Sequence, residues 1–405
     1  MKLKKSEYYN YFVLYLLIAT TAIPFFFDSQ IFSITGFCIS GLVFFNRGFK
    51  IEMSFILVCA LFFCMEVFQY LNYNVFIFET FASIFIKLSF SYFVVRILGL
   101  NFYSYYVNLI KLICLISLFF YLIILVPGVF DFLFYDVSPL FKAPFRRVNE
   151  FYAEVKTVIL YTLDPELLST LRNPGPFWEP GIFSIFILLA IMFNIIRYNQ
   201  LLNKTNIILS ITLFTTLSTT GILGFFLILF SYYLINSKSP YKAFHVLIII
   251  FVSMFLFFKL PFLSEKVKQN IELTDYTGSR FGSLMADWKL FKESPFIGWG
   301  RGKMRFGEGR ELFFSQESHR NNGISALLTQ YGIFFSIIYF LLYYISFKTI
   351  CKMYNNNLRF AVFCVFIIMF VGFSQTIFTR QFFLSFLFLG LILDNKFKVR
   401  NNVRA

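Results

Sequence analysis

Long apolar segments recur along the whole chain, and they constrain its fold more than any other feature of the sequence. Hydrophobic residues make up 58% of the 405 residues, and the mean hydropathy is +0.72. A soluble domain cannot bury so much apolar surface, whereas about twenty apolar residues suffice for a helix to cross a bilayer. The sequence therefore predicts an all-α integral membrane protein, because helices satisfy their own backbone polar groups in lipid.

The apolar segments predict about twelve transmembrane helices and two extended polar loops. The predicted spans are residues 8–27, 29–46, 52–70, 75–99, 102–127, 180–197, 205–217, 219–236, 243–262, 323–347, 359–376 and 380–395. The loops are residues 128–179 and 262–322. We expect a single polytopic membrane domain, residues 1–405. Its first apolar segment is long and lacks a small-residue cleavage site, so we expect a retained helix rather than a signal peptide.

The net charge of +15 follows the membrane topology and does not indicate a nucleic-acid partner. With the N-terminus inside, the basic connections "NRGFK", "RYNQLLNK", "NSKSPYK" and "KTICKMYNNNLR" and the C-terminal "NKFKVRNNVR" all fall inside. This is the distribution that the positive-inside rule predicts. If residues 205–217 and 219–236 formed one span, the connections after them would change sides and the agreement with the positive-inside rule would be lost. With twelve spans, both long loops fall on the outer face.

No pattern in the sequence indicates a metal, a cofactor or a disulfide framework. The six cysteines lie within apolar segments or at the end of one, and neither loop contains any. The outer loops hold no Asp-x-Asp pair and no histidine cluster, and phosphate-binding Walker or Rossmann patterns are absent. We therefore expect neither metal nor cofactor.

The second loop combines an amphipathic segment with a cluster of basic residues. One helical face of residues 279–293 is apolar, and Arg280 and Asp287 flank it. We expect this helix to lie on the membrane surface with Trp288 at headgroup level. After the turn "SPFIGWGRG", the cluster is formed by Arg301, Lys303, Arg305 and Arg310. Arginine binds phosphate oxygens in bidentate fashion, so the cluster suits a phosphate or pyrophosphate, although single arginines have nearby glutamates to pair with.

Two outer-face positions are candidates for acid–base chemistry. His319 lies in the second loop beside Asn321 and Asn322, where it is either a general base or an ordinary solvated side chain. Glu179 lies in "RNPGPFWEPG", where Pro and Gly indicate the start of a helix. It is either a partner of the helix dipole or a catalytic carboxylate, and Trp178 beside it is typical of the membrane interface.

Ionisable residues within the spans are candidates for function by default. Glu79 and Lys87 lie inside the fourth span and Lys111 inside the fifth. Lys87 is the deepest of them. We expect it to neutralise a carboxylate, either Glu66 or Glu79.

Several of these motifs together resemble a known family. "RNPGPFWEPGIF" resembles the R-x-x-G-x-F-x-E-P-G pattern of bacterial O-antigen polymerases of the Wzy type. "GSR", "KESPFIGWGRG" and "HRNNGISALLTQYGI" resemble their second periplasmic loop and the helix after it, and "LSTTGILGF" is similar to their Ser/Thr-Gly break. The agreement covers about the C-terminal 240 residues. One departure is Arg320, which separates His319 from Asn321 where the family often has His directly before Asn.

The resemblance implies a glycosyltransferase with a GT-C-like architecture, independent of metal and acting on the periplasmic face of the bacterial inner membrane. Both termini would be cytoplasmic, and the enzyme would join undecaprenyl-pyrophosphate-linked oligosaccharide units. The residues that would bind the pyrophosphate are Arg172, Arg280, Arg301, Arg305 and Arg310. Glu179 and His319 are the candidate bases, with Arg172 beside them in the catalytic set. Trp178, Asn321 and Asn322 are expected to contact the substrate.

Two other functions remain open, and a chain-length regulator is a possible partner. An O-antigen ligase shares the fold class and transfers the finished glycan to lipid A core; the "EPG" element and the modest second loop favour the polymerase. A lipid-linked oligosaccharide flippase would concentrate its charges in a central cavity and keep its outer loops short, which does not fit this sequence.

Overall fold

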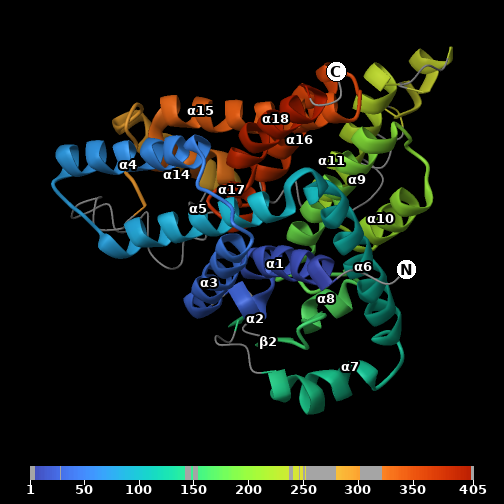
Figure 1. Ribbon diagram of the computed structural model, residues 1–405. Helices are drawn as coiled ribbons and strands as arrows, with labels where there is room; N and C mark the ends of the chain where they lie inside the picture. Colours follow the sequence, from blue (N-terminus) through green and yellow to red (C-terminus); the bar gives the residue numbers. More distant parts are fainter. Residues whose placement is uncertain are drawn as a thin grey trace. The chain divides into compact units, whose positions relative to one another are not determined.

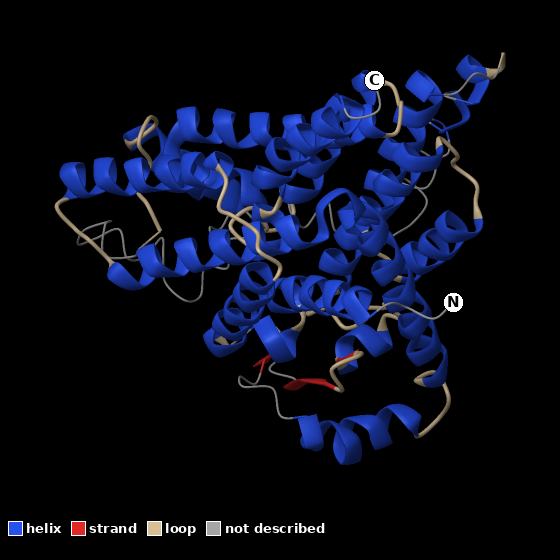
Figure 2. Ribbon diagram, viewed as in Figure 1, coloured by secondary structure: helices blue, strands red, loops and turns tan. Residues whose placement is uncertain are grey.

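The computed structural model is mostly helical, as Figure 2 shows. It describes residues 5–27, 29–141, 147–148, 154–236, 240–245, 247–249, 251, 280–301 and 322–402. The chain forms two compact units. Unit 1 comprises Met1–Lys50 with Phe90–Phe225, and unit 2 comprises Ile51–Ser89 with Phe226–Ala405. The helical class is confirmed, while the single membrane domain stays a prediction.

Unit 1 is built around α9, which is buried along almost its whole length. Its helices are α1 (Lys5–Ala22), α2 (Pro24–Phe27), α3 (Gln30–Asn46), η1 (Gly99–Asn101), α6 (Phe102–Ile123), α9 (Pro180–Tyr198) and α10 (Lys204–Thr215), labelled in part in Figure 1. α5 (Phe78–Leu98) and α11 (Thr219–Ser231) each continue into unit 2. α6 and α10 pack against α9, and the Tyr106 hydroxyl donates to the Phe186 carbonyl at 2.9 Å.

The first loop is a small folded layer with its own apolar core, not a plain polar connection. It contains α7 (Val129–Asp131), η2 (Phe132–Val137), η3 (Ser138–Phe141), β1 (Arg147–Val148), β2 (Glu154–Thr157), β3 (Thr162–Leu163) and α8 (Pro165–Ser169). The strands form an antiparallel sheet in the order β1-β2-β3. The strands were not expected from the sequence, because each is too short to show a period-two pattern.

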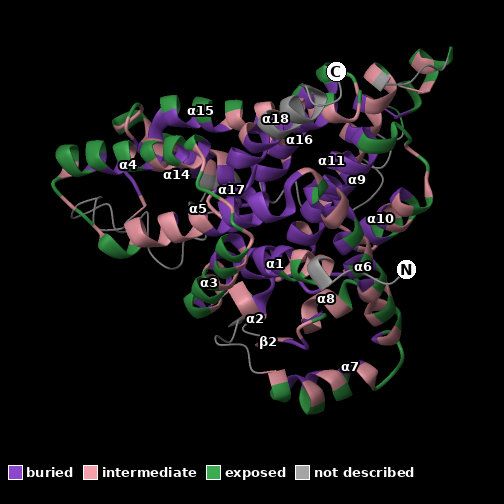
Figure 3. Cartoon of the chain, viewed as in Figure 1, coloured by how far each residue is buried: buried purple, intermediate pink, exposed green. Residues whose placement is uncertain are grey.

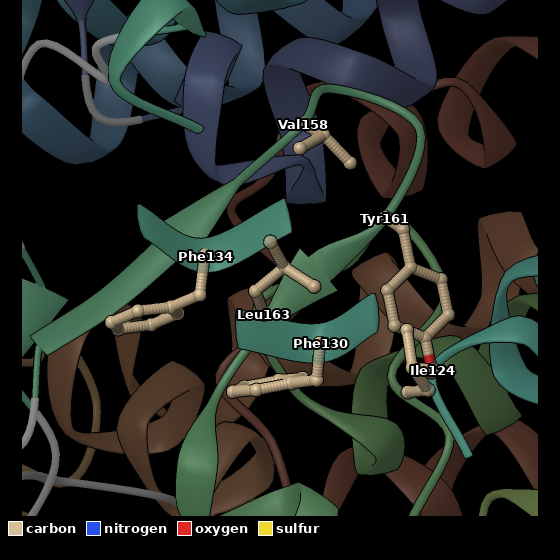
Figure 4. Packing of buried hydrophobic residues seen from close by; sticks show 6 residues of the cluster. All are labelled: Ile124, Phe130, Phe134, Val158, Tyr161 and Leu163. Carbon is tan, nitrogen blue, oxygen red and sulfur yellow. The ribbon is translucent and has the colours of Figure 1, made fainter. Parts of the chain in front are cut away.

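Six side chains from the end of α6, the helical turns, β3 and the connection between β2 and β3 form the core of this layer. They are Ile124, Phe130, Phe134, Val158, Tyr161 and Leu163, shown in Figure 4. Phe130 and Phe134 stack at 5.5 Å between ring centroids. Burial raises the pKa of the Tyr161 hydroxyl above its usual value. The loop therefore holds its own shape through hydrophobic burial.

Unit 2 is centred on α15 (Gly323–Met353), which packs against α14, α16 and α18. Its other elements are α4 (Met53–Tyr73), η4 (Tyr232–Asn236), α14 (Arg280–Glu293), α16 (Leu358–Gly372), α17 (Gln381–Leu384) and α18 (Phe386–Asn402). The hydroxyls of Tyr339 and Tyr343 donate to the carbonyls of Phe378 and Phe383, at 2.5 and 2.7 Å. These bonds satisfy buried polar groups along the helix contact.

Four apolar stretches among the described residues are long enough to cross a membrane. They are Met53–Tyr73, Phe78–Ile123, Pro180–Tyr198 and Gly323–Met353. Shorter apolar helices fill other predicted ranges, and Figure 3 shows exposed residues along α3 and α4, as lipid-facing helices require. These findings agree with a membrane protein. The number of twelve spans and the GT-C-like architecture stay predictions.

Candidate functional site

In unit 1 the stretch Arg172–Gly181 is anchored by Asn173, whose side chain is completely buried. The Asn173 backbone N–H donates to the Thr215 carbonyl at 3.0 Å, and its Nδ2 donates to Thr215 Oγ1 at 2.9 Å. Its Oδ1 accepts from Ser117 Oγ at 2.7 Å and from the Gly175 backbone N–H at 3.0 Å. One side chain thus fixes this stretch to the ends of α6 and α10.

Gly175 and Phe177 of the motif pack against the first turns of α9. Gly175 has φ +56, and a Cβ there would lie 2.7 Å from the Phe183 ring, so only glycine fits. The Phe177 ring stacks on Phe183 and Phe186, at 5.1 and 4.8 Å between centroids. The Trp178 backbone N–H donates to the Ala22 carbonyl at 3.3 Å. These motif residues therefore hold the start of α9 in place.

The charged residues of the motif lie at the margin of this packing. Glu179 is the N-cap residue of α9, with Pro180 at the first helical position as expected. Its side chain makes no capping hydrogen bond to the first turn. Arg172, Trp178 and Glu179 are all half-buried. Both roles expected for Glu179, partner of the helix dipole and catalytic carboxylate, therefore stay predictions.

The "EPG" motif meets the Ser/Thr-Gly break within unit 1. Ser184 Oγ, in the second turn of α9, donates to the Gly181 carbonyl at 2.7 Å and to Ser218 Oγ at 3.2 Å. A Cβ at Gly221 would lie 2.6 Å from the Ser184 Cβ, so glycine permits this close approach of α11 to α9. Two motifs about forty residues apart in the sequence are therefore parts of one contact.

In unit 2 two further motifs form one structural element, which we call the backbone joint: residues 294–300 paired with residues 329–333. α15 is interrupted at Gly332, with φ 73 and ψ 179. Backbone hydrogen bonds run from Ile333 N–H to the Pro295 carbonyl, from Trp299 N–H to the Thr329 carbonyl and from Gly300 N–H to the Gln330 carbonyl, each at 2.8 Å. The "SPFIGWG" segment is thus bonded through its backbone to α15 on both sides of the interruption at Gly332.

Two side chains of α4 and a backbone carbonyl of α14 hold the joint. Gln69 Nε2 on α4 donates to the carbonyls of Ile297 and Gln330, at 3.0 and 2.8 Å. The Tyr73 ring stacks on Trp299 at 5.0 Å between centroids. Trp299 Nε1 donates to the Leu290 carbonyl of α14 at 2.9 Å. The stacked Tyr73–Trp299 pair and five hydrogen bonds, three between backbone groups and two from Gln69, therefore hold the joint together.

α14 exists where the sequence predicts an amphipathic helix, and it is docked through Asp287. The Asp287 side chain is completely buried, and its Oδ2 accepts from Ser325 Oγ at 2.5 Å. Met285 and Trp288 are exposed, which agrees with the predicted membrane-facing side. Asn322 is also buried, and its Oδ1 accepts from the first N–H groups of α15. Its predicted contact with substrate stays a prediction.

The joint places Arg301 beside α5. Arg301 Nη2 donates to the Thr80 carbonyl at 3.0 Å. Arg301 therefore contacts the helix that carries Lys87.

The structure leaves several predicted site residues untested. The side chain of Arg280, which begins α14, and the residues Arg305, Arg310, His319 and Asn321 lie outside the described part of the chain. Of the carboxylates expected to neutralise Lys87, Glu66 is buried and Glu79 is exposed. Within the described ranges, no three His, Cys, Asp or Glu side chains are grouped as a metal site requires.

Residues 205–340 match a family model described as O-antigen ligase. This match confirms the resemblance to the superfamily of O-antigen polymerases and ligases. It covers about a third of the chain and includes the Ser/Thr-Gly break, the second loop and the backbone joint. None of the curated proteins compared with the chain matches it. Members of the matched family transfer glycosyl groups, so the finding supports a function of the polymerase or ligase type and does not favour a flippase.

Proposed function

We propose that this protein is an O-antigen polymerase acting on the periplasmic face of the inner membrane. It transfers a growing chain from its undecaprenyl pyrophosphate to a new lipid-linked unit. The observation that carries this choice is the structure of Arg172–Gly181. Asn173, Gly175 and Phe177 hold this stretch against the start of α9. Arg172 and Glu179, which flank them in the sequence, are half-buried. A half-buried carboxylate is suited to acid–base chemistry, because its surroundings can tune its proton affinity.

The proposed reaction needs only a cationic site and a base. A sugar hydroxyl of the acceptor unit attacks the anomeric carbon of the donor chain. A new C–O glycosidic bond forms, and the bond to the pyrophosphate oxygen breaks, so the pyrophosphate stays on its lipid. Arginine side chains stabilise the negative charge that develops on this leaving group. Glu179 or His319 accepts the hydroxyl proton. Because pyrophosphate is a good leaving group, the reaction needs no metal.

In this proposal the residues divide by role. The candidates for binding the pyrophosphate are Arg172, Arg280, Arg301, Arg305 and Arg310. Trp178, Asn321 and Asn322 contact the sugars. The fold is GT-C-like, both termini are cytoplasmic, and a chain-length regulator is a possible partner in the membrane.

The second candidate is an O-antigen ligase, which the description of the matched family favours. The lipopolysaccharide banding pattern of a deletion strain separates the two functions. A polymerase mutant should make lipid A core carrying a single unit. Core without any unit would contradict the polymerase and point to a ligase or a flippase.

Glu179→Gln should reduce long-chain polysaccharide at least tenfold without lowering the amount of protein in the membrane. The substitution keeps the size of the side chain and removes the proton acceptor, and general bases contribute about 10²–10⁴ to the rate. Quantified lipopolysaccharide ladders and immunoblots of the same cells measure both quantities.

Glu154→Gln is the matched control, because Glu154 lies in the same loop and forms an ion pair with Lys156 at 3.7 Å. It should leave the ladder unchanged. If Glu179→Gln reduced polymer and protein in equal proportion, Glu179 would have a folding role instead of a catalytic one.

A further inference from the structure

α14 has two distinct faces, and one of them docks on α15 and the joint. Ala286, Asp287 and Leu290 are buried on this docked face. Thr329 Oγ1 of α15 donates to the Asp287 carbonyl at 3.1 Å. Trp299 Nε1 of the joint donates to the Leu290 carbonyl at 2.9 Å. These contacts fix which side of α14 is turned away from α15.

The side of α14 that is turned away is apolar. Met285 and Trp288 are exposed, and Leu284 and Phe291 are half-buried. Spacings of three, four and seven residues put these four side chains on one side of the helix. The Trp288 ring stacks on Phe291 at 5.4 Å between centroids. An apolar face of this kind is typical of a helix that lies in the interface of a bilayer.

Just beyond α14 the chain reaches the exposed apolar side of α15. Phe296, in the joint, is exposed, and its ring stacks on Phe334 at 5.5 Å between centroids. Phe334 begins an exposed apolar stripe that continues through Ile337 and Leu341. This stripe lies on one of the apolar stretches that are long enough to cross a membrane, so it faces lipid. The apolar face of α14 therefore leads directly to a lipid-facing surface.

The interruption of α15 at Gly332 lies at the level of a bilayer surface. The segment 333–353 after it is about 30 Å long, which matches the hydrocarbon thickness of a bilayer. This segment is apolar until Lys348 and Lys352 near its far end, where basic residues are expected on the cytoplasmic side. Gly332 and the joint then lie at the opposite surface. α14 leads into the joint, so it ends at headgroup level.

Lys292 adds a positive charge to the apolar face. It follows Trp288 by four residues, and its Nζ lies 5.8 Å from the centre of the Trp288 ring. Lys289 and Glu293 are exposed beside it and carry opposite charges. A lysine keeps its stem on apolar surface while its ammonium group reaches the headgroups. Because lysines close to a membrane attract acidic lipids, this face fits a lipid whose headgroup is negative.

We propose that the apolar face of α14 lies in the headgroup region of the bilayer and binds an acidic phospholipid through Lys292. The fatty chains contact Met285 and Trp288, and the phosphate lies beside the Lys292 ammonium group. A second copy of the chain would also cover an apolar face, but the level of the joint and the lysine favour lipid. The sequence predicted only a position at the membrane surface, and the structure adds the cation that selects the lipid. This contact does not depend on the proposed polymerase reaction.

Quenching of Trp288 fluorescence by brominated lipids tests the contact at this one position. The purified full-length protein is placed in phosphatidylcholine vesicles that contain brominated phosphatidylglycerol or brominated phosphatidylcholine at equal mole fraction. Trp178 and Trp299 also emit. The signal of Trp288 is therefore the difference between each protein and the same protein carrying Trp288→Phe. The ratio of quenching by the two lipids gives the preference for the acidic headgroup.

Lys292→Gln is the test variant, and Lys348→Gln is its matched control. Lys348 lies on α15, and its Nζ is 5.6 Å from the centre of the Tyr344 ring, four residues earlier in the helix. Both substitutions therefore remove one lysine from an aromatic ring at the same spacing. Lys292→Arg keeps the charge. Thermal unfolding of each variant checks that the fold is intact.

We expect both lipids to quench Trp288, with phosphatidylglycerol preferred about fivefold, the effect of one lysine near a membrane surface. The preference should disappear in Lys292→Gln and persist in Lys292→Arg and Lys348→Gln. The measurement uses no enzymatic activity, so a protein that makes no ladder in cells but shows this preference overturns the polymerase and retains the lipid site.

Two results would overturn the lipid site. Equal quenching of the wild type by the two lipids would show that Lys292 does not select an acidic headgroup. Absence of quenching by either lipid would show that the apolar face of α14 is not in contact with lipid. If the protein were then a dimer that Trp288→Asp dissociated, the occupant of this face would be a second copy of the chain.

Discussion

Gly332→Ala should lower the free energy of unfolding by more than about 3 kcal/mol and abolish polymer formation. Gly332 has φ 73 and ψ 179, a region that is essentially restricted to glycine. A Cβ at this position would also lie 2.2 Å from the Phe296 carbonyl oxygen and 2.4 Å from its carbon. Both atoms belong to the backbone, so no side-chain rotation relieves the clash. The joint must open, and the segment that places Arg301 must move.

Gly48→Ala is the matched control for backbone strain. Gly48 also has a positive φ of 68, but a Cβ there would meet no atom within 4 Å. Its substitution should cost only about 1 kcal/mol, the usual penalty for a left-handed residue. Thermal unfolding of both variants in the same detergent compares the two effects. Equal destabilisation would mean that the packing of the joint contributes nothing, contrary to the structure.

Arg172→Ala should reduce long-chain polysaccharide about 100-fold or more while single-unit lipopolysaccharide persists. Removing one donor from a site that stabilises developing negative charge has an effect of this size. Arg280→Ala should act in the same way. Arg172→Lys should restore part of the activity, because it keeps the charge and loses the bidentate fork.

Arg359→Ala removes an exposed arginine at the start of α16, on the predicted cytoplasmic side, and should leave the ladder normal. The banding pattern in a deletion strain complemented with each variant is the readout. A normal ladder from both Arg172→Ala and Arg280→Ala would show that these arginines do not form the polymerase site.

The sequence predicted those parts of the fold that depend on local patterns. Pro180 begins α9 as expected, because proline and glycine after a capping position define a helix start locally. The amphipathic pattern of residues 279–293 likewise predicted α14, which spans Arg280–Glu293. Hydropathy located most of the apolar helices.

Features that depend on contacts between distant residues were not predictable. Gly298 lies against the backbone of Gln330 and Tyr331, and Gly332 lies against the backbone of Phe296 and Ile297. No local signal in the sequence shows that these two segments are partners. Asp287 was expected at the edge of an apolar face, and it is instead completely buried beside Ser325. Spacing along a single sequence cannot reveal which helix ends meet.

The most direct test of the proposed polymerase is a reaction of the purified protein with one substrate alone. This substrate is a synthetic polyprenyl-pyrophosphate-linked repeat unit, without lipid A core. We predict a ladder of lipid-linked chains of two or more units, with release of one polyprenyl pyrophosphate for each bond formed. A protein that made no product until lipid A core was added, and then transferred one unit to it, would be a ligase and would contradict this account.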